Sequence, residues 1–200
     1  EIIPNDNIAA VLAEQILNKE KGICVTPINA SMLIEWLAAK YNSKVEYCRV
    51  GAPAIAEKMI SVGANFGYEE TGKYFFPPML WPDALIAMSK ILAVVAVRES
   101  LTQLLKQFPK FYQKKQAVEC EEVKKEQIME NVDRLWNNSG AVKTIKVDGI
   151  KKFYSDNSWL LIRASGTEPL IRIFSEAQSL RRAEELLSLG IELVNKAMNN

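Results

Sequence analysis

A short run near the C-terminus combines the side chains that a phosphate dianion requires. It reads Arg163-Ala-Ser-Gly-Thr-Glu-Pro169. Arg163 can offer a bidentate guanidinium, and Ser165 and Thr167 add hydroxyl donors. Gly166 permits a turn whose backbone N–H groups converge on an anion, and the proline stiffens the exit. The run is compatible with a phosphate-binding loop, but on its own it is more typical of an ordinary polar hairpin.

Arg172 lies three residues beyond Pro169 and is a further cation near this loop. Whether its side chain points toward the same anion depends on the pairing of the flanking strands, which the sequence does not give.

A second run, Phe66-Gly-Tyr-Glu-Glu-Thr-Gly-Lys73, places glycines around polar residues between strand-like flanks. Glu69 can accept hydrogen bonds from two vicinal hydroxyls, and Thr71 can donate or accept one. Taken alone, the run is more typical of a solvated turn, because charged turns are usually just exposed.

Composition excludes several kinds of site. The 200 residues contain no histidine, which removes histidine acid–base chemistry, Ser-His-Asp constellations and the commonest zinc ligand. Cys24, Cys48 and Cys120 form no CxxC pair, so we expect buried thiols in a reducing cytoplasm rather than disulfides or a zinc ribbon.

Charge and hydropathy bear on possible partners. Lysine and arginine number 25 against 24 aspartates and glutamates, interspersed along the chain, which predicts neither a nucleic-acid nor a membrane partner. The longest apolar run, Ile91 to Val97, is too short to cross a bilayer. The chain opens on Glu1 rather than Met, directly in a helical pattern, which leads us to expect further sequence before it.

Residues 1–107 alternate helical and strand-like patterns, which predicts an α/β/α layered domain. Asn5 or Asp6 and Asn29 are expected to cap the first two helices, and Pro53 fits the first turn of the third. A long buried helix is expected to close the domain. The first expected helix follows Asn5 or Asp6 and is ended by Gly22, and the third starts near Pro53 and carries Ile55, Met59 and Ile60. The other expected helices are 31–40 and 83–105, and the expected strands are 23–26, 45–50 and the flanks of the 66–76 loop.

Residues 108–200 follow a composition shift at Phe108-Pro109-Lys110 and predict a small α+β domain with a largely antiparallel sheet. Asp148-Gly149 signals a hairpin turn. The expected strands are 117–120, 142–147, 158–164 and 170–176, and the expected helices are 124–137 and 179–198.

Both loops resemble those of one family. The run from Trp159 to Ala177 resembles the phosphate-binding loop and flanking strands in the last domain of the α-D-phosphohexomutases, which include phosphoglucomutase, phosphomannomutase and phosphoglucosamine mutase. By this resemblance, the phosphate-binding residues are Arg163, Ser165, Gly166 and Thr167.

The run from Phe66 to Lys73 is similar to the sugar-contacting loop in the family's third domain. The sugar-binding residues implied are Glu69, Thr71 and Lys73. Tyr68 replaces the usual glycine and Lys73 the usual histidine, and a lysine there could also bind phosphate as a point charge.

The resemblance covers nearly the whole chain. It makes 1–107 a sugar-recognition domain and 108–200 a phosphate-binding domain. Residues Arg49 to Pro53 resemble the family's loop before the helix that leads to the sugar motif. Asp83 falls where the family often has an aspartate opening the long helix, and we interpret it as a helix cap rather than a catalyst.

Family members transfer a phosphoryl group from a phosphoserine in the first domain, with Mg²⁺ held by an aspartate-rich loop in the second. Neither motif occurs in this sequence. The resemblance therefore implies no catalytic residue and no metal ligand here, and no turnover by the chain alone. Mg²⁺, a hexose 1,6-bisphosphate intermediate and the N-terminal domains would belong to the whole enzyme.

The resemblance implies the C-terminal half of a phosphohexomutase, an isomerase of carbohydrate metabolism that interconverts hexose 6-phosphate and hexose 1-phosphate. A stand-alone, non-catalytic phosphosugar-binding or regulatory protein is the alternative, and a structural module that binds nothing is a third. The sequence does not determine which hexose phosphate is preferred, because the candidates differ by one substituent.

Overall fold

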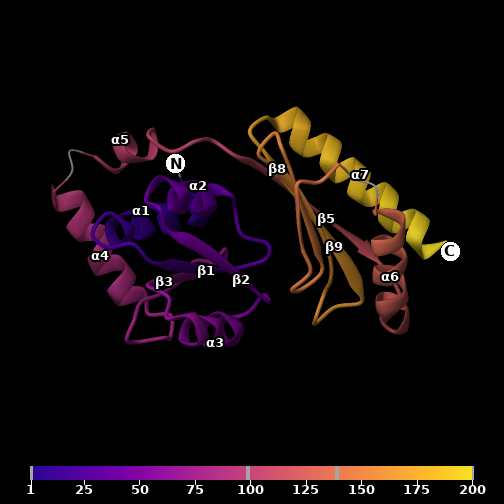
Figure 1. Cartoon of the computed structure of the whole chain (residues 1–200), viewed down its shortest axis with the longest axis horizontal. Coiled ribbons are helices and arrows are strands. Elements are labelled where there is room, and N and C mark those ends of the chain that lie inside the picture. The colour runs from indigo at the N-terminus through magenta and orange to yellow at the C-terminus, as the bar shows by residue number, and fades with distance from the viewer. Residues whose placement is uncertain (1, 98–99, 138–139, 200) are drawn as a thin grey trace. The chain divides into compact units, whose positions relative to one another are not determined.

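The computed structural model describes residues 2–97, 100–137 and 140–199. The chain folds into two compact units, Glu1–Pro109 and Lys110–Asn200 (Figure 1). The division falls within the composition shift at Phe108-Pro109-Lys110.

The first unit contains a four-stranded mixed sheet in the order β2-β1-β3-β4. β1 is parallel to β2 and β3, and β4 is antiparallel to β3. Figure 1 shows α1 and α2 on one face of the sheet and α3 on the other, which confirms the predicted α/β/α layers. The strands are β1 (Ile23–Pro27), β2 (Lys44–Cys48), β3 (Phe66–Glu69) and β4 (Lys73–Phe75), and the helices are α1 (Asn5–Leu17), α2 (Leu33–Lys40), α3 (Ala52–Val62), α4 (Ala84–Val97) and α5 (Leu101–Leu105).

Helix α3 shows how local sequence sets an element of this unit. Pro53 lies in its first turn, as predicted, and Gly63 ends it in the left-handed conformation with φ 63°. Ile55 and Met59, one helical turn apart, pack with Val25 of β1 in the core.

The helix expected over 83–105 is instead two helices. Asp83 caps α4, as predicted, because its Oδ1 accepts hydrogen bonds from the backbone N–H of Leu85 (2.8 Å) and Ile86 (3.1 Å). Ser100 is extended, with φ −163°, and its Oγ accepts from Gln103 N at 3.1 Å to start α5. Residues 98 and 99 lie outside the described part of the chain.

The prediction that this long helix is buried was also wrong. In α4 only Ala87 and Val94 are buried, whereas Leu85 and Leu92 on the outer face are 71% and 59% exposed. An apolar sequence all round a helix does not reveal which of its faces the rest of the unit covers.

The caps predicted for the first two helices were wrong as well. Pro4 is the N-cap residue of α1, and no side chain caps that end. Asn5 and Asp6 use their side chains on the β3–β4 hairpin instead. Met32 is the N-cap residue of α2, and the buried Oδ1 of Asn29 has no hydrogen-bond partner within the described residues.

The second unit is a five-stranded sheet in the order β5-β9-β8-β7-β6, antiparallel throughout, as predicted. α6 and α7 cover one face of it (Figure 1). That face carries Leu160, Ile162, Ile171 and Ile173, which pack in one core with Val194 of α7. The elements are β5 (Tyr112–Glu119), a 3₁₀ turn (Glu122–Lys124), α6 (Lys125–Leu135), β6 (Lys143–Ile145), β7 (Ile150–Tyr154), β8 (Ser158–Ala164), β9 (Leu170–Ala177) and α7 (Leu180–Met198).

Strand β7 was not predicted, because the adjacent Lys151 and Lys152 interrupt its apolar pattern. Both lysines are buried nevertheless. Their amines lie over tryptophan rings, Lys151 at 3.9 Å from the centroid of Trp159 and Lys152 at 4.9 Å from that of Trp136. Cation–π contacts of this kind offset part of the cost of burying an ammonium.

No helix within the described residues is long and apolar enough to cross a membrane.

Candidate functional site

The predicted phosphate loop joins β8 to β9, and two hydrogen bonds to its backbone tie it to its own unit. Ser165 N donates to Leu170 O at 3.0 Å, which closes the loop. The buried amine of Lys125, the first residue of α6, donates to Ser165 O at 2.7 Å. Ser165 is buried, and Gly166 and Thr167 are exposed at the tip. The loop therefore has a fixed base and an accessible tip.

Arg163 is the last residue but one of β8, and its guanidinium is largely buried. Its side chain is 11% exposed, and Nη2 lies 3.0 Å from Asp148 Oδ2 in the turn before β7. Its Nε is buried without a hydrogen-bond partner within the described residues. A buried N–H without an acceptor is uncommon, which indicates that a bound group supplies the acceptor.

Gly149 brings the Asp148 turn against Arg163. Its φ is +100°, and a Cβ there would lie 2.4 Å from Arg163 Cβ and 2.5 Å from Ile162 O. Only glycine fits this position.

Strand register shows where Arg172 points. It is paired directly with Arg163 across β8 and β9, so the two side chains project from the same face of the sheet. Because neighbouring Ile162 and Ile173 face the core under α6 and α7, this is the opposite face. Arg172 forms an ion pair with Glu168 of the loop. The two arginines thus form a cationic pair, each with one carboxylate of its own unit.

The reason predicted for Gly166 differs from what the structure shows. Its φ lies outside the left-handed region, and an added Cβ would meet nothing within 4 Å. Neither the turn nor the packing of the fold requires glycine there.

The predicted sugar loop is the hairpin between β3 and β4. Glu69 and Lys73 are directly paired across it. Glu69 Oε2 accepts from Lys73 Nζ at 2.7 Å and from Thr71 Oγ1 at 3.1 Å. The structure therefore brings all three predicted sugar residues together around one carboxylate oxygen.

The first turn of α1 ties down this hairpin. Asn5 Nδ2 donates to Glu70 O at 3.0 Å, and Tyr74 OH donates to Asn5 O at 3.3 Å. Tyr68 OH donates to Asp6 Oδ1 at 2.7 Å. Tyr68, which stands where the family usually has glycine, is fully buried, and Asp6 accepts its hydroxyl. Burial, aided by the Asp6 charge, raises the pKa of Tyr74 to about 12.

Sequence reasoning missed the residues that hold the loops: Asn5, Asp6, Lys125 and Asp148. Asp148-Gly149 did signal a turn, but nothing in the sequence linked that turn to Arg163. Of the residues from Arg49 to Pro53, the first three connect β2 to α3, with Gly51 at φ 126°, and the last two begin α3.

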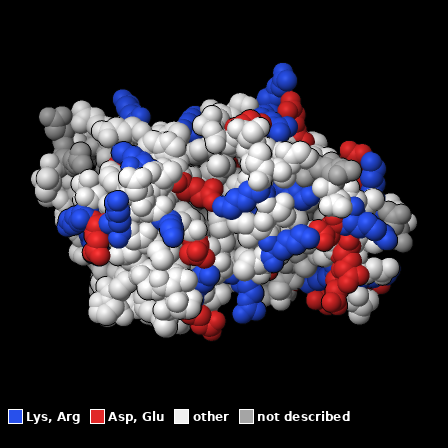
Figure 2. All heavy atoms as spheres, in the orientation of Figure 1, with Lys and Arg blue, Asp and Glu red and all other residues white. Residues whose placement is uncertain are grey.

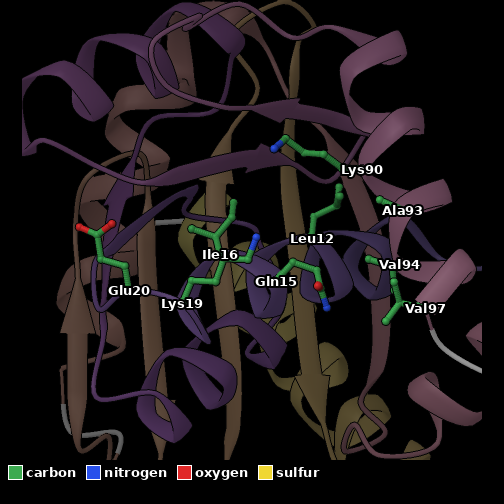
Figure 3. Close-up of a pocket in the computed structure, with 9 residues that line it drawn as sticks. All are labelled: Leu12, Gln15, Ile16, Lys19, Glu20, Lys90, Ala93, Val94 and Val97. Carbon is green, nitrogen blue, oxygen red and sulfur yellow. The ribbon is translucent and has the colours of Figure 1, made fainter.

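One other feature of the first unit contains none of the loop residues. A groove of about 620 Å³ lies between α1 and α4 (Figure 3). Its walls include Leu12, Ile16 and Val94, with Lys19 and Lys90 among the polar residues. It contains no predicted site residue.

No group of three or more histidine, cysteine, aspartate or glutamate side chains in the described ranges could hold a metal ion.

On the face that Figure 2 shows, basic and acidic side chains are interspersed. This surface distribution agrees with the even balance of charge along the sequence.

Comparison with known proteins gives matches along both units. Residues 4–112 match the model of the phosphoglucomutase/phosphomannomutase alpha/beta/alpha domain III, and residues 116–188 match that of the phosphoglucomutase/phosphomannomutase C-terminal domain. These matches confirm the resemblance inferred from the two loops.

Curated relatives extend beyond this chain. A phosphoglucomutase/phosphomannomutase of Thermococcus kodakarensis is 35% identical over 199 residues, which are 98% of this chain and 43% of the relative. A phosphoglucosamine mutase of Methanocaldococcus jannaschii is 35% identical over 200 residues, 97% of this chain and 44% of the relative. The chain spans less than half the length of these relatives.

Solved structures share the fold. A phosphoglucomutase/phosphomannomutase family protein from Burkholderia thailandensis superposes with a TM-score of 0.83 at 18% identity, over 98% of this chain and 43% of its own. An N-acetylphosphoglucosamine mutase of Aspergillus fumigatus was solved with GlcNAc-6P and magnesium. It superposes with a TM-score of 0.70 at 16% identity, over 99% of this chain and 45% of its own.

Proposed function

Because the chain belongs to the phosphoglucomutase/phosphomannomutase family, whose third and C-terminal domains it carries, we propose that it binds the phosphosugar of a phosphohexomutase. The whole enzyme would interconvert hexose 6-phosphate and hexose 1-phosphate through a hexose 1,6-bisphosphate. An A. fumigatus relative solved with glucose 1,6-bisphosphate supports that intermediate.

The observation that carries the phosphate role is the arrangement around Arg163. Its buried Nε–H has no acceptor within the described residues, while Asp148 occupies Nη2. A phosphate oxygen would satisfy this donor with a charge-assisted hydrogen bond. Arg172, in register on the next strand, adds a second positive charge on the same face.

The loop tip would complete the phosphate site. Ser165 and Thr167 would supply hydroxyl donors. Since neither backbone conformation nor packing requires glycine at position 166, the bare backbone there fits close approach of an anion. Lys125 would hold the loop by its bond to Ser165 O.

The hairpin of the first unit would recognise the sugar. Lys73 and Thr71 both use Oε2 of Glu69, which leaves Oε1 to accept from ring hydroxyls. Thr71 Oγ1 can accept a hydrogen bond from the sugar while it donates to Glu69. The expected pairing of Glu69 with two vicinal hydroxyls would therefore fall on Oε1.

The chemical step would need groups that this chain does not supply. The phosphoserine and the Mg²⁺ ligands would belong to the N-terminal domains of the family. Magnesium neutralises charge on the transferring phosphoryl group. The residues of this chain would bind and orient the substrate. We expect them to do so in a reducing compartment such as the cytoplasm, because Cys24, Cys48 and Cys120 are free thiols, and free thiols are usual there.

Binding of glucose 6-phosphate and of inorganic phosphate to the chain, followed by ¹H–¹⁵N NMR titration, tests this proposal. Arg163→Gln should weaken binding of both ligands about tenfold to a hundredfold, because a charge-assisted bond is lost. Arg181→Gln is the matched control, since Arg181 is 91% exposed and forms its ion pair with Glu185 along α7, away from the loop.

Glu69→Gln should weaken the binding of glucose 6-phosphate but leave the binding of inorganic phosphate unchanged, because the proposed partner of Glu69 is a sugar hydroxyl. Unchanged affinity in Arg163→Gln, or shifts that the two arginine variants alter equally, would refute the phosphate assignment.

A further inference from the structure

The hairpin fixes a lysine against the carboxylate that would accept the sugar hydroxyls. Lys73 and Glu69 face each other as the last paired residues of β3 and β4. The amine lies 2.7 Å from Glu69 Oε2, and the glutamate side chain is only 7% exposed. Backbone pairing, not a chance rotamer, therefore brings this positive charge to the proposed sugar site.

The contacts from α1 keep this pair in place. Lys73 is 47% exposed, and a pair so exposed on a loose loop would contribute little. Here Asn5 holds Glu70 O on one side of the hairpin tip, and Asp6 holds Tyr68, next to Glu69. Gly72, with φ +89°, packs against the Asn5 side chain and donates its N–H to Glu69 O at 3.0 Å.

Lys73 and Glu69 carry opposite charges, so the pair itself has no net charge. A buried carboxylate alone would attract a cation strongly, because little water screens it. With Lys73 in contact, that attraction is cancelled, and the ammonium repels any second cation within about 6 Å. Hydroxyl groups still find an acceptor in Oε1.

We propose that Lys73 is a specificity-determining residue that makes the site select hexose phosphates without a ring charge over hexosamine phosphates that carry a free ammonium. This inference rests on the proposed function, since it takes Glu69 as the acceptor for the sugar. It concerns the charge of the substrate ring, and it gives Lys73 a discriminating role beyond the sugar-binding role that the resemblance implies.

The test compares three ligands by NMR titration of the chain: glucose 6-phosphate, glucosamine 6-phosphate and N-acetylglucosamine 6-phosphate. At pH 7 the amine of glucosamine 6-phosphate is mostly protonated, since amines of this kind titrate at about 8. The chain should then bind glucose 6-phosphate at least about threefold tighter than glucosamine 6-phosphate, and this ratio should approach one at pH 9.

Lys73→Gln should remove or reverse the preference at pH 7, because Glu69 would then attract the ammonium. N-acetylglucosamine 6-phosphate, which has no amine charge, should show the same affinity ratio to glucose 6-phosphate in both proteins. Lys58→Gln is the matched control, because Lys58 pairs with Glu46 at 3.0 Å on the surface of the same unit. It should keep the wild-type preference.

The outcomes separate this inference from the proposed function. If the chain binds hexose phosphates in an Arg163-dependent way but Lys73→Gln leaves the glucose-to-glucosamine ratio unchanged, the charge selection is refuted and the binding function stands. If no hexose phosphate binds, both are refuted. If Lys73→Gln loses the NMR resonances of the hairpin, Lys73→Arg serves as the second variant. Arginine keeps the positive charge, so Lys73→Arg should keep the preference for glucose 6-phosphate.

Discussion

Arg163 owes its position to residues that contact no ligand. Asp148 pairs with one amino group, and Gly149 lets the turn lie directly on the strand that carries the arginine. Glycine is needed for two reasons at once, the positive φ and the absent Cβ. The arginine is thus held before any anion arrives, which lowers the entropy cost of binding.

Gly149→Ala should destabilise the chain by about 2–4 kcal/mol and weaken phosphate binding, because the new Cβ would displace the Arg163 backbone. Urea unfolding gives the first quantity and NMR titration with inorganic phosphate the second. Gly63→Ala is the control, since Gly63 also has a positive φ, +63°, but nothing lies within 4 Å of its Cβ position. It should cost only the conformational term, about 1 kcal/mol. Equal losses in the two variants would show that the contact with Arg163 does not matter.

The β3–β4 hairpin and the first turn of α1 act together as one element of the sugar site. They are about sixty residues apart in sequence, yet Asn5 bonds to Glu70 O and Asp6 to Tyr68 OH of the hairpin. Tyr74 belongs to this contact through its hydroxyl, which donates to Asn5 O. Removing a proton from that hydroxyl would place a negative charge beside a carbonyl oxygen and Asp6.

Alkaline pH should therefore destabilise this contact. Burial and the Asp6 charge raise the pKa of Tyr74 to about 12, whereas a tyrosine of the unfolded chain titrates at about 10. The folded state keeps a proton that the unfolded state releases, so the stabilisation is complete below pH 10 and is lost between about pH 10 and 12. The slope from one proton is at most about 1.4 kcal/mol per pH unit.

Urea unfolding at pH 9, 10, 11 and 12 measures this slope. Tyr74→Phe should be less stable than wild type at pH 9, because the bond to Asn5 is lost, and should lose less stability as the pH rises. Parallel pH profiles for the two proteins would rule out a contribution from Tyr74.

At the scale of the whole molecule, the chain consists of two compact units joined near Pro109. Phe108 is buried in the first unit, and its ring centroid lies 6.2 Å from that of Trp36. Tyr112 already belongs to β5, which pairs along its length with β9 in the second. Only a few residues therefore link the two units.

Limited trypsin digestion should cut first at Lys106 or Lys110, both of which are exposed. Lys114 and Lys115 should resist, since they are paired with Ser175 and Phe174 in the sheet. Mass spectrometry of the first fragments identifies the cut. Initial cleavage between Gly22 and Phe76 would argue against two independent units.

The sequence by itself determined those features that depend on neighbouring residues. Pro53 and Asp83 placed the starts of two helices because first-turn geometry and capping are local. The strand pattern of the second unit was visible wherever the apolar residues were uninterrupted. The two loops were recognisable because their residue types and spacing stay within single runs, although the binding roles of those residues remain predictions.

Tertiary structure decided what joins distant segments. The direction of Arg172 followed from the register of β8 and β9, which no single strand contains. Asn5 and Asp6 look like helix caps in sequence, but hydrogen bonds to the hairpin use the same groups. The burial of Lys151 and Lys152 depended on tryptophan rings elsewhere in the fold. In each case several local arrangements were open to the side chain, and packing against a remote segment selected one of them.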